Sequence, residues 1–244
     1  MATFHLDEIA MASALWEAAK AGNTAEASRL LDEGAPVTWE NSLDDGFTAL
    51  IKAAQGGHPD TVEVLLDRGA DLEVKSWDGF TALMKAAQGG HKDTVEVLLD
   101  RGADLEVKSW DDSTALTMAA EHGHRDTAEL LLDRGADLEA KDGDGSKALM
   151  KAAQGGHKDT VEVLLDRGAD LEAKCNADTS KMSSAYTATS VRSVLKASPS
   201  AAVAAHSADA LNLAPIGNAT FMRVVSPEAM VSRGVAPAPA DSCL

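Results

Sequence analysis

Four histidines are the first residues in this sequence whose chemistry needs to be weighed. They recur every 33 residues, each directly after a glycine, at His58, His91, His124 and His157. His122 precedes His124 by two residues, so this pair could begin a metal site, but no third ligand of a suitable type is nearby. Cys175 and Cys243 are too few for a thiolate-rich site or a disulfide framework. The sequence therefore predicts neither a bound metal nor a cofactor.

Carboxylates recur at the same interval and form two rows. The rows are Asp67, Asp100, Asp133 and Asp166, and Glu73, Glu106, Glu139 and Glu172. Paired carboxylates catalyse acid–base reactions when a pocket moves their pKa values apart. Rows of equivalent carboxylates on the outside of a repeated structure offer no such difference, so we interpret them as a solvated face.

The spacing of nucleophiles does not suggest catalysis either. Both cysteines and most of the serines lie in residues 175–244, away from the repeated histidines. The segment GDGSK at residues 143–147 lacks the full spacing of a phosphate-binding loop and occupies a turn of a repeated unit. We therefore expect a protein that is not an enzyme, and an enzyme that uses residues of the C-terminal tail is the less favoured alternative.

The charge of the chain argues against two classes of partner. Residues 1–174 contain 17 basic and 35 acidic side chains, whereas residues 175–244 contain 5 and 4. A phosphate backbone requires clustered Lys and Arg, so we expect no nucleic acid and no anionic membrane surface as a partner. No apolar run approaches about 18 residues, and the N-terminus does not resemble a signal peptide. The cytoplasm is the expected location, with the nucleus as the alternative.

The elements that carry these residues are copies of one another. The segment KAAQGGHKDTVEVLLDRGADLE at residues 85–106 recurs without change at 151–172. It also recurs at 52–73 with Pro59 in place of Lys, and a diverged copy occupies 117–140. A period between about 20 and 50 residues is the signature of stacked repeats.

Each copy predicts two short helices. In residues 76–108, Gly79 indicates a tight turn, and Thr81 can cap a first helix over 82–88 that Gly89-Gly90 ends. A second helix covers about 93–101 and ends at Gly102.

Helices of this length are unstable alone in water, so their apolar sides must be buried against neighbouring copies. Val95, Leu98 and Leu99 form the stripe that we expect to be buried in this way.

At residues 78–104 the sequence DGFTALMKAAQGGHKDTVEVLLDRGAD resembles the ankyrin repeat family, whose unit runs D-G-x-T-P-L-H-x-A-A-x-x-G-H-x-x-V-x-x-L-L-x-x-G-A-D. The resemblance implies an all-α ankyrin repeat solenoid of helix–turn–helix units with β-turn or hairpin tips. We assign full units to 43–75, 76–108, 109–141 (the divergent one) and 142–174, after a degenerate capping unit in 1–42. It also implies that the histidine after each glycine is structural and bonds to backbone within its own loop.

The remaining residues differ from the repeats. Ala, Ser and Pro make up 32 of the 70 residues in 175–244, which predicts a disordered tail. Residues 182–196 place several apolar side chains near one helical face, and we expect this segment to cap the last unit.

This sequence also departs from the family pattern. Ala-Leu with Ile, Met or Thr replaces Pro-Leu-His, which removes a helix-starting Pro and a bridging His from each full unit. Asp112 replaces the turn glycine of the third full unit, and Lys147 replaces the capping Thr of the fourth. We expect these two units to be locally weaker.

The resemblance implies that partners are bound on a concave surface made by the turn tips and the exposed face of each first helix. The function that we expect is a monomeric, non-catalytic scaffold or adaptor that binds a protein partner. The alternative is a regulatory inhibitor that occludes an enzyme or a transcription factor. The expected contact residues are Phe47, Lys52, Trp77, Phe80, Lys85, Gln88, Trp110, Asp111, Met118, Glu121, His122 and Lys151.

Their expected roles differ. Trp77 and Trp110 are aromatic anchors, the three lysines meet acidic groups, and residues 109–141 give selectivity because this unit diverges.

Overall fold

A computed structural model describes residues 2–170 of the 244-residue chain. The expected disordered tail in 175–244 and the expected capping helix over 182–196 lie outside the described residues. The elements are α1 (Ala2–Lys20), α2 (Thr24–Asp32), β1 (Glu40–Asn41), β2 (Phe47–Thr48), α3 (Ala49–Gly56), α4 (Pro59–Asp67), α5 (Ala82–Gly89), α6 (Lys92–Asp100), α7 (Ala115–Glu121), α8 (Arg125–Asp133), α9 (Ala148–Gly155) and α10 (Lys158–Asp166).

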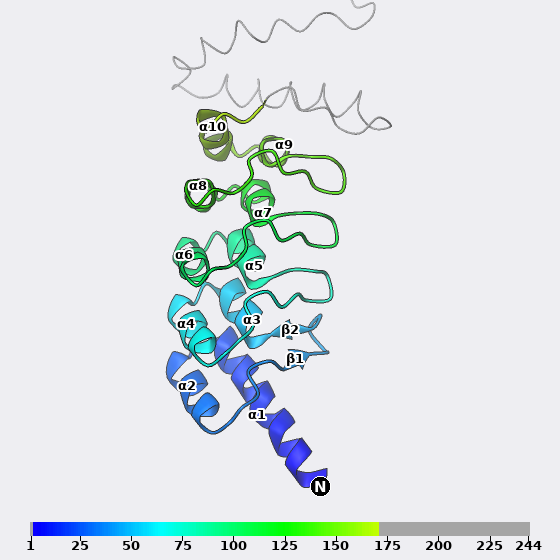
Figure 1. Cartoon of the computed structure of the whole chain (residues 1–244), viewed down its shortest axis with the longest axis vertical. Coiled ribbons are helices and arrows are strands. Elements are labelled where there is room, and N and C mark those ends of the chain that lie inside the picture. Colours follow the sequence, from blue (N-terminus) through cyan, green and yellow to red (C-terminus); the bar gives the residue numbers. More distant parts are fainter. Residues whose placement is uncertain (1, 171–244) are drawn as a thin grey trace, which may run out of the picture. The chain divides into compact units, whose positions relative to one another are not determined.

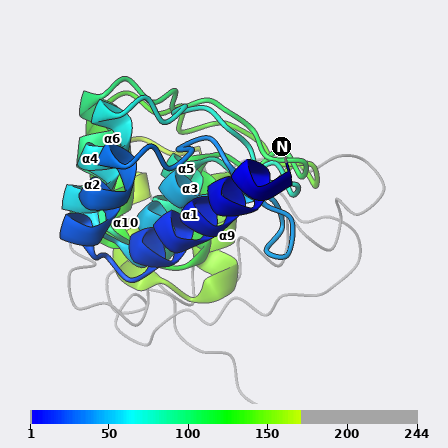
Figure 2. The same ribbon diagram turned by 90° about the horizontal axis from the view of Figure 1, so that it is seen from below.

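The helices form two layers. The odd-numbered helices, which we call the inner helices, pack in chain order, and the even-numbered outer helices pack in a second column beside them (Figure 1). The loop before each inner helix from α3 to α9 projects beyond the inner layer as a tip, and the view along the stack places the inner helices between the tips and the outer helices (Figure 2). The predicted helical solenoid with hairpin tips is therefore confirmed.

The first tip is the most regular of the hairpins. Its two strands pair in antiparallel register, with Glu40 opposite Thr48 and Asn41 opposite Phe47. The fourth tip keeps a single bridge between Lys141 and Lys147.

The inner helices begin and end as the sequence predicts. The hydroxyl of Thr81 accepts the backbone N–H of Met84, and Gly90 ends α5 with a φ of 71°. Thr48 caps α3 in the same manner, and Gly57 ends it. Gly is favoured at such ends because it adopts positive φ without a steric cost.

The substituted turn position and the substituted capping position behave differently. Asp112 adopts a φ of 57°, which an Asp tolerates better than most residues, and the following helix, α7, starts with a reciprocal capping box between Thr114 and Thr117. Lys147 makes no side-chain cap at the start of α9 and instead pairs with Glu139. The fourth unit therefore lacks a bond that the third unit has, and its weaker local stability stays a prediction.

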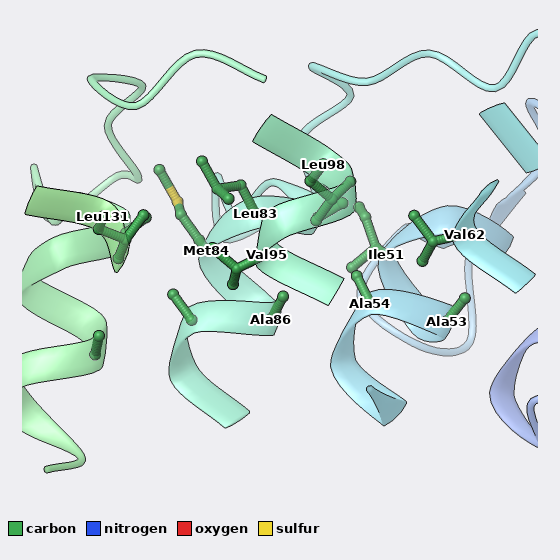
Figure 3. Packing of buried hydrophobic residues seen from close by; sticks show 14 of the residues in the cluster. Ile51, Ala53, Ala54, Val62, Leu83, Met84, Ala86, Val95, Leu98 and Leu131 are labelled. Carbon is green, nitrogen blue, oxygen red and sulfur yellow. The ribbon is translucent and has the colours of Figure 1, made fainter. Parts of the chain in front are cut away.

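The core consists of side chains between consecutive repeats. Val62, Val95, Leu98 and Leu131 are fully buried where outer helices meet their neighbours, and Ala53, Ala54 and Ala86 let the inner helices approach closely (Figure 3). Ile51 and Met84 are also buried, at the position where the family pattern has His. This exchange replaces a polar group with apolar area between the repeats.

The carboxylate rows are more than a solvated face, which corrects part of the sequence interpretation. Arg101, directly after α6, binds Glu63 and Asp67 of α4, both at 2.8 Å. Arg134 and Arg167 repeat this fork one and two units further on. The Glu row also bridges repeats, because Glu73 accepts the backbone N–H of Asp104 at 2.9 Å. Each exposed ion pair contributes little, so these bonds mainly fix the register between outer helices.

No helix within residues 2–170 combines the length and the apolar character needed to cross a membrane.

Burial between repeats leads to a prediction about stability. Leu98→Ala removes a fully buried side chain and should lower the free energy of unfolding by about 2–5 kcal/mol, because the cavity can close only partly. Leu43→Ala makes the same chemical change at a side chain that is 95% exposed and should change stability by less than about 0.5 kcal/mol. Urea unfolding of both variants measures the difference, and equal effects would contradict an inter-repeat core.

Candidate functional site

The inner-helix surface carries a column of lysines and aromatic rings. Lys52 lies over the rings of Trp16 and Phe47, with its Nζ 5.2 Å and 4.7 Å from their centroids. Lys85 lies over Phe80 at 3.9 Å and Phe47 at 5.3 Å. Phe47 is 6% exposed and Phe80 is partly buried, so the two rings contribute to the surface mainly by supporting the lysines.

Two of the expected lysines already have acidic partners within the chain. Lys52 pairs with Asp44 at 2.6 Å, and Lys151 pairs with Asp142 at 3.0 Å. Partial burial acts to lower the pKa of Lys151, but the bond to Asp142 outweighs this effect and raises the pKa.

Lys85 differs from these two lysines. Its Nζ donates to the Gln88 side chain at 3.1 Å, and within the described part of the chain it has no carboxylate at ion-pair distance. Burial lowers its pKa, and the more distant carboxylates of Asp78 and Asp45 counteract this effect. Lys85 is thus the lysine of this surface whose charge is least compensated by a direct contact.

The tips hold two exposed tryptophans on a fixed support. Trp77 is 57% exposed and Trp110 is 79% exposed. The ring of Trp77 lies on Gly46, where an added Cβ would come within 2.5 Å of the indole, and Trp110 lies on Gly79 with the same clearance. The backbone N–H of Trp77 also donates to the Asp45 carbonyl at 2.8 Å. Each tryptophan is therefore fixed by the tip before it, while much of its ring faces solvent.

In the contact between the third and fourth tips, the large and the small residue have changed places. Asp112 stands where the two earlier tips have Gly46 and Gly79, and Gly143 stands where the two earlier units have Trp77 and Trp110. The N–H of Gly143 donates to the Asp111 carbonyl at 2.8 Å, and an added Cβ there would meet that oxygen at 3.2 Å. This large-to-small exchange was visible in the sequence as a correlated change, but sequence reasoning did not use it.

The divergent third unit presents a mixed surface. His122 and Glu121 are exposed, and the His122 ring stacks on that of His124 with their centroids 6.2 Å apart. Met118 is 4% exposed, so it shapes α7 from within. Hydrogen bonds from Ser109 and Ser113 outweigh partial burial and hold the pKa of Asp111 below its usual value.

The repeated histidines join neighbouring units, which corrects the expectation that they bond within their own loops. Nε2 of His91 lies 3.0 Å from the Gln55 carbonyl, and Nε2 of His124 lies 2.9 Å from the Gln88 carbonyl, both one repeat earlier. His58 and His157 make the equivalent contacts with Lys20 and Glu121. Each of these four rings also packs on a glycine of the preceding unit.

The described residues contain no group of three potential metal ligands. A hollow of about 410 Å³ opens at the start of α8 beside His124 and Asp126, away from the lysine column and the tips. None of the twelve expected contact residues lines it.

Two comparisons place this arrangement among known proteins. The sequence pattern described as ankyrin repeats, in three copies, matches residues 6–76, 73–142 and 109–175. Over 59 residues, which are 24% of this chain, the sequence is 51% identical to proteins named mitochondrial disaggregase from Bos taurus and Homo sapiens. The matched part of this chain spans only 8% of the length of these relatives.

The contact between tips leads to a prediction with a matched control. Gly79→Ala should lower the melting temperature and displace the Trp110 ring, because the new Cβ has no space there and φ is 80°. Gly102→Ala introduces a comparable backbone strain at a φ of 90° with nothing within 4 Å. Thermal unfolding and near-ultraviolet circular dichroism measure both effects. If the two variants are alike in melting temperature and aromatic spectrum, Trp110 does not depend on this contact.

A second prediction concerns pH. Burial is the main cause that lowers the pKa of His124, with His122, His91 and His157 adding to it and the Gln88 carbonyl opposing. In the unfolded chain the His124 imidazole binds a proton near pH 6.5, whereas in the folded chain it binds one only at lower pH. The free energy of unfolding should therefore fall as pH decreases through about 6.5. Urea unfolding between pH 7.5 and 5 should give a flatter pH dependence for His124→Asn than for the natural chain. An unchanged slope would exclude His124 as a source of it.

Proposed function

We propose, on the premise that this chain belongs to the ankyrin repeat family, that it is a non-catalytic scaffold or adaptor that binds a protein partner across its tips and inner helices. Repeats of this family are generally modules for protein–protein interaction. The observation that carries the proposal is the pair of exposed tryptophans, Trp77 and Trp110, on supported tips. Large exposed aromatic side chains in adjacent positions are typical anchors of interfaces.

The support beneath the tryptophans favours binding. The Gly46–Trp77 and Gly79–Trp110 contacts already restrict the two indoles before any partner arrives. A side chain that is already ordered loses less conformational freedom on association, so more of its interaction energy remains as affinity. The tips can therefore act as anchors without the chain rearranging.

The lysines have a narrower role than their positions in the sequence suggest. A partner carboxylate would have to compete with Asp44 for Lys52 and with Asp142 for Lys151. Lys85 is only 9% exposed, but it has no such competitor at ion-pair distance in the described chain, so we place the main contact with an acidic group of the partner there, beside Gln88.

Selectivity is proposed for the third unit. Glu121 and His122 are exposed there, whereas the equivalent residues in the other three full units are Gln and Gly. Met118 and Phe47 are buried and would act by positioning their neighbours, while Phe80 and Asp111 would lie at the edges of the interface.

A regulatory inhibitor that occludes its partner is the second candidate, since the same surface would serve it. We propose a monomer in the cytoplasm, with the nucleus as the alternative, and the acidic repeats favour a protein over nucleic acid as the partner.

Affinity capture from the source cell tests the proposal. The intact chain should recover at least one protein that Trp77→Ala/Trp110→Ala recovers about ten-fold less well, because the variant loses both anchors. Lys92→Ala/Arg125→Ala, which alters exposed residues at the starts of α6 and α8, is the control and should recover the protein fully. Equal recovery of every protein by all three chains, with equal melting curves, would sink the proposal.

A further inference from the structure

Three successive tips each carry a large exposed apolar side chain. Leu43, Trp77 and Trp110 project from three successive tips, and their exposed fractions are 95%, 57% and 79%. We call these three residues the tip strip. It ends at the fourth tip, where Gly143 offers no side chain. The tip strip therefore consists of two tryptophans and, at one end, a leucine.

Acidic side chains accompany both tryptophans. Asp45 belongs to the tip on which Trp77 rests, and Asp78 belongs to the tip on which Trp110 rests. Both carboxylates are exposed, and neither makes an ion pair or a side-chain hydrogen bond in the described chain. Asp111 and Asp112 add two more exposed carboxylates beside Trp110. Each of the two tryptophans therefore presents an aromatic face beside a negative charge.

The basic side chains near the tips do not cancel this charge. Lys75 and Lys108 donate to the carbonyls of Lys108 and Lys141 in the next repeat, at 2.8 Å and 3.3 Å. Lys85 attracts Asp45 and Asp78 from a distance, but it is only 9% exposed and lies over Phe80. The tips thus keep an excess of exposed carboxylates within a repeat region that is itself strongly acidic.

The stacking of the repeats sets the distance between Trp77 and Trp110. Packed helices lie about 8–10 Å apart, and successive tips are offset by one inner-helix spacing because α3, α5 and α7 pack directly on one another. In a polyproline II segment, which rises about 3.1 Å per residue with three residues per turn, side chains i and i+3 lie on one side, about 9 Å apart. This spacing matches one repeat, whereas a β-strand places side chains on one side only at i and i+2, about 7 Å apart.

We infer that the tip strip binds an extended basic segment of the partner protein, with two cationic side chains three residues apart on Trp77 and Trp110. The inference rests on the proposed function and names the chemistry of its partner. The cations would lie against the indole faces and pair with Asp45 and Asp78, and an aliphatic residue three positions further along would reach Leu43. Arg fits best, because its planar guanidinium stacks on an aromatic ring while it bonds to a carboxylate.

Other occupants of the strip explain less of it. An apolar or proline-rich segment would use the indoles but leave the carboxylates beside them partly desolvated and unpaired, which costs free energy. A purely electrostatic partner would use the carboxylates but would need neither the tryptophans nor their spacing. An extended cationic segment uses both features at once.

Defined peptides test the inference with the full-length chain. The probe is a capped nine-residue peptide with Leu, Arg and Arg at positions 1, 4 and 7 and polar residues elsewhere. A second peptide carries the reverse order, Arg, Arg and Leu, at the same three positions. We expect calorimetry and tryptophan fluorescence to detect binding by the better order. Replacing both Arg with Gln, or moving them to adjacent positions, should weaken that binding at least ten-fold. Lys at both positions should bind more weakly than Arg.

Variants of the chain identify the site. Trp77→Ala/Trp110→Ala and, separately, Asp45→Asn/Asp78→Asn should each weaken the Arg peptide at least ten-fold, and the second variant keeps the side-chain shapes. Asp93→Asn/Asp126→Asn is the matched control, because it removes two exposed carboxylates at the starts of α6 and α8, away from the tips. It should bind as the natural chain does. Melting curves show that each variant is folded.

Three results would overturn the inference. The first is an affinity that depends on peptide charge but not on Arg spacing or on the tryptophans, which indicates general attraction to an acidic protein. The second is equal weakening by the tip and control variants. The third is a failure of every peptide to bind. If the peptides fail while the captured partner still depends on Trp77 and Trp110, the basic chemistry is wrong and the proposed function stands. If neither depends on them, both fail.

Discussion

Burial of one unit's apolar stripe against the next is the interaction on which the rest of this structure depends. The helices from α2 onward have seven to nine residues each, too few to be stable alone in water. Val95 and Leu98 become buried only because adjacent repeats cover them, with small residues such as Ala86 allowing the close approach. The chain repeats its letters because every interface between units poses the same packing problem, and the same residues solve it each time.

Polar groups add register to this apolar contact. The contacts of the repeated histidines, such as His91 with Gln55, connect the start of an outer helix to the end of the inner helix one repeat earlier. The arginine forks, as at Arg101, connect the outer helices. Each bond is worth little alone, but all of them fix the same translation between repeats. That translation sets the spacing of the tips. A surface residue in one unit therefore has a defined distance from its counterpart in the next, and this distance is the scale on which an extended partner would be recognised.

The tips show how a repeated scaffold acquires an individual surface. Where the turn residue is Gly46 or Gly79, a tryptophan of the next unit can lie on it, and where Asp112 replaces the glycine, the next unit has Gly143. The exchange ends the tip strip after two tryptophans without interrupting the stack of helices. The core tolerates this variation because the tips project beyond the inner helices and contribute little to the buried stripe (Figure 1).

The sequence alone determined the repeat, the two helices of each unit, the Thr81 cap, the glycine ends and the exposure of Trp77 and Trp110, because these follow from periodicity and local backbone chemistry. Only the tertiary structure decided which side chains meet across units. It showed that Phe47 and Met118 are buried, that Lys52 already holds Asp44, and that the histidines bond to the preceding repeat instead of their own loops. Residues separated by a whole repeat carry no local signal of contact, since their distance depends on how the units stack and not on the chain between them.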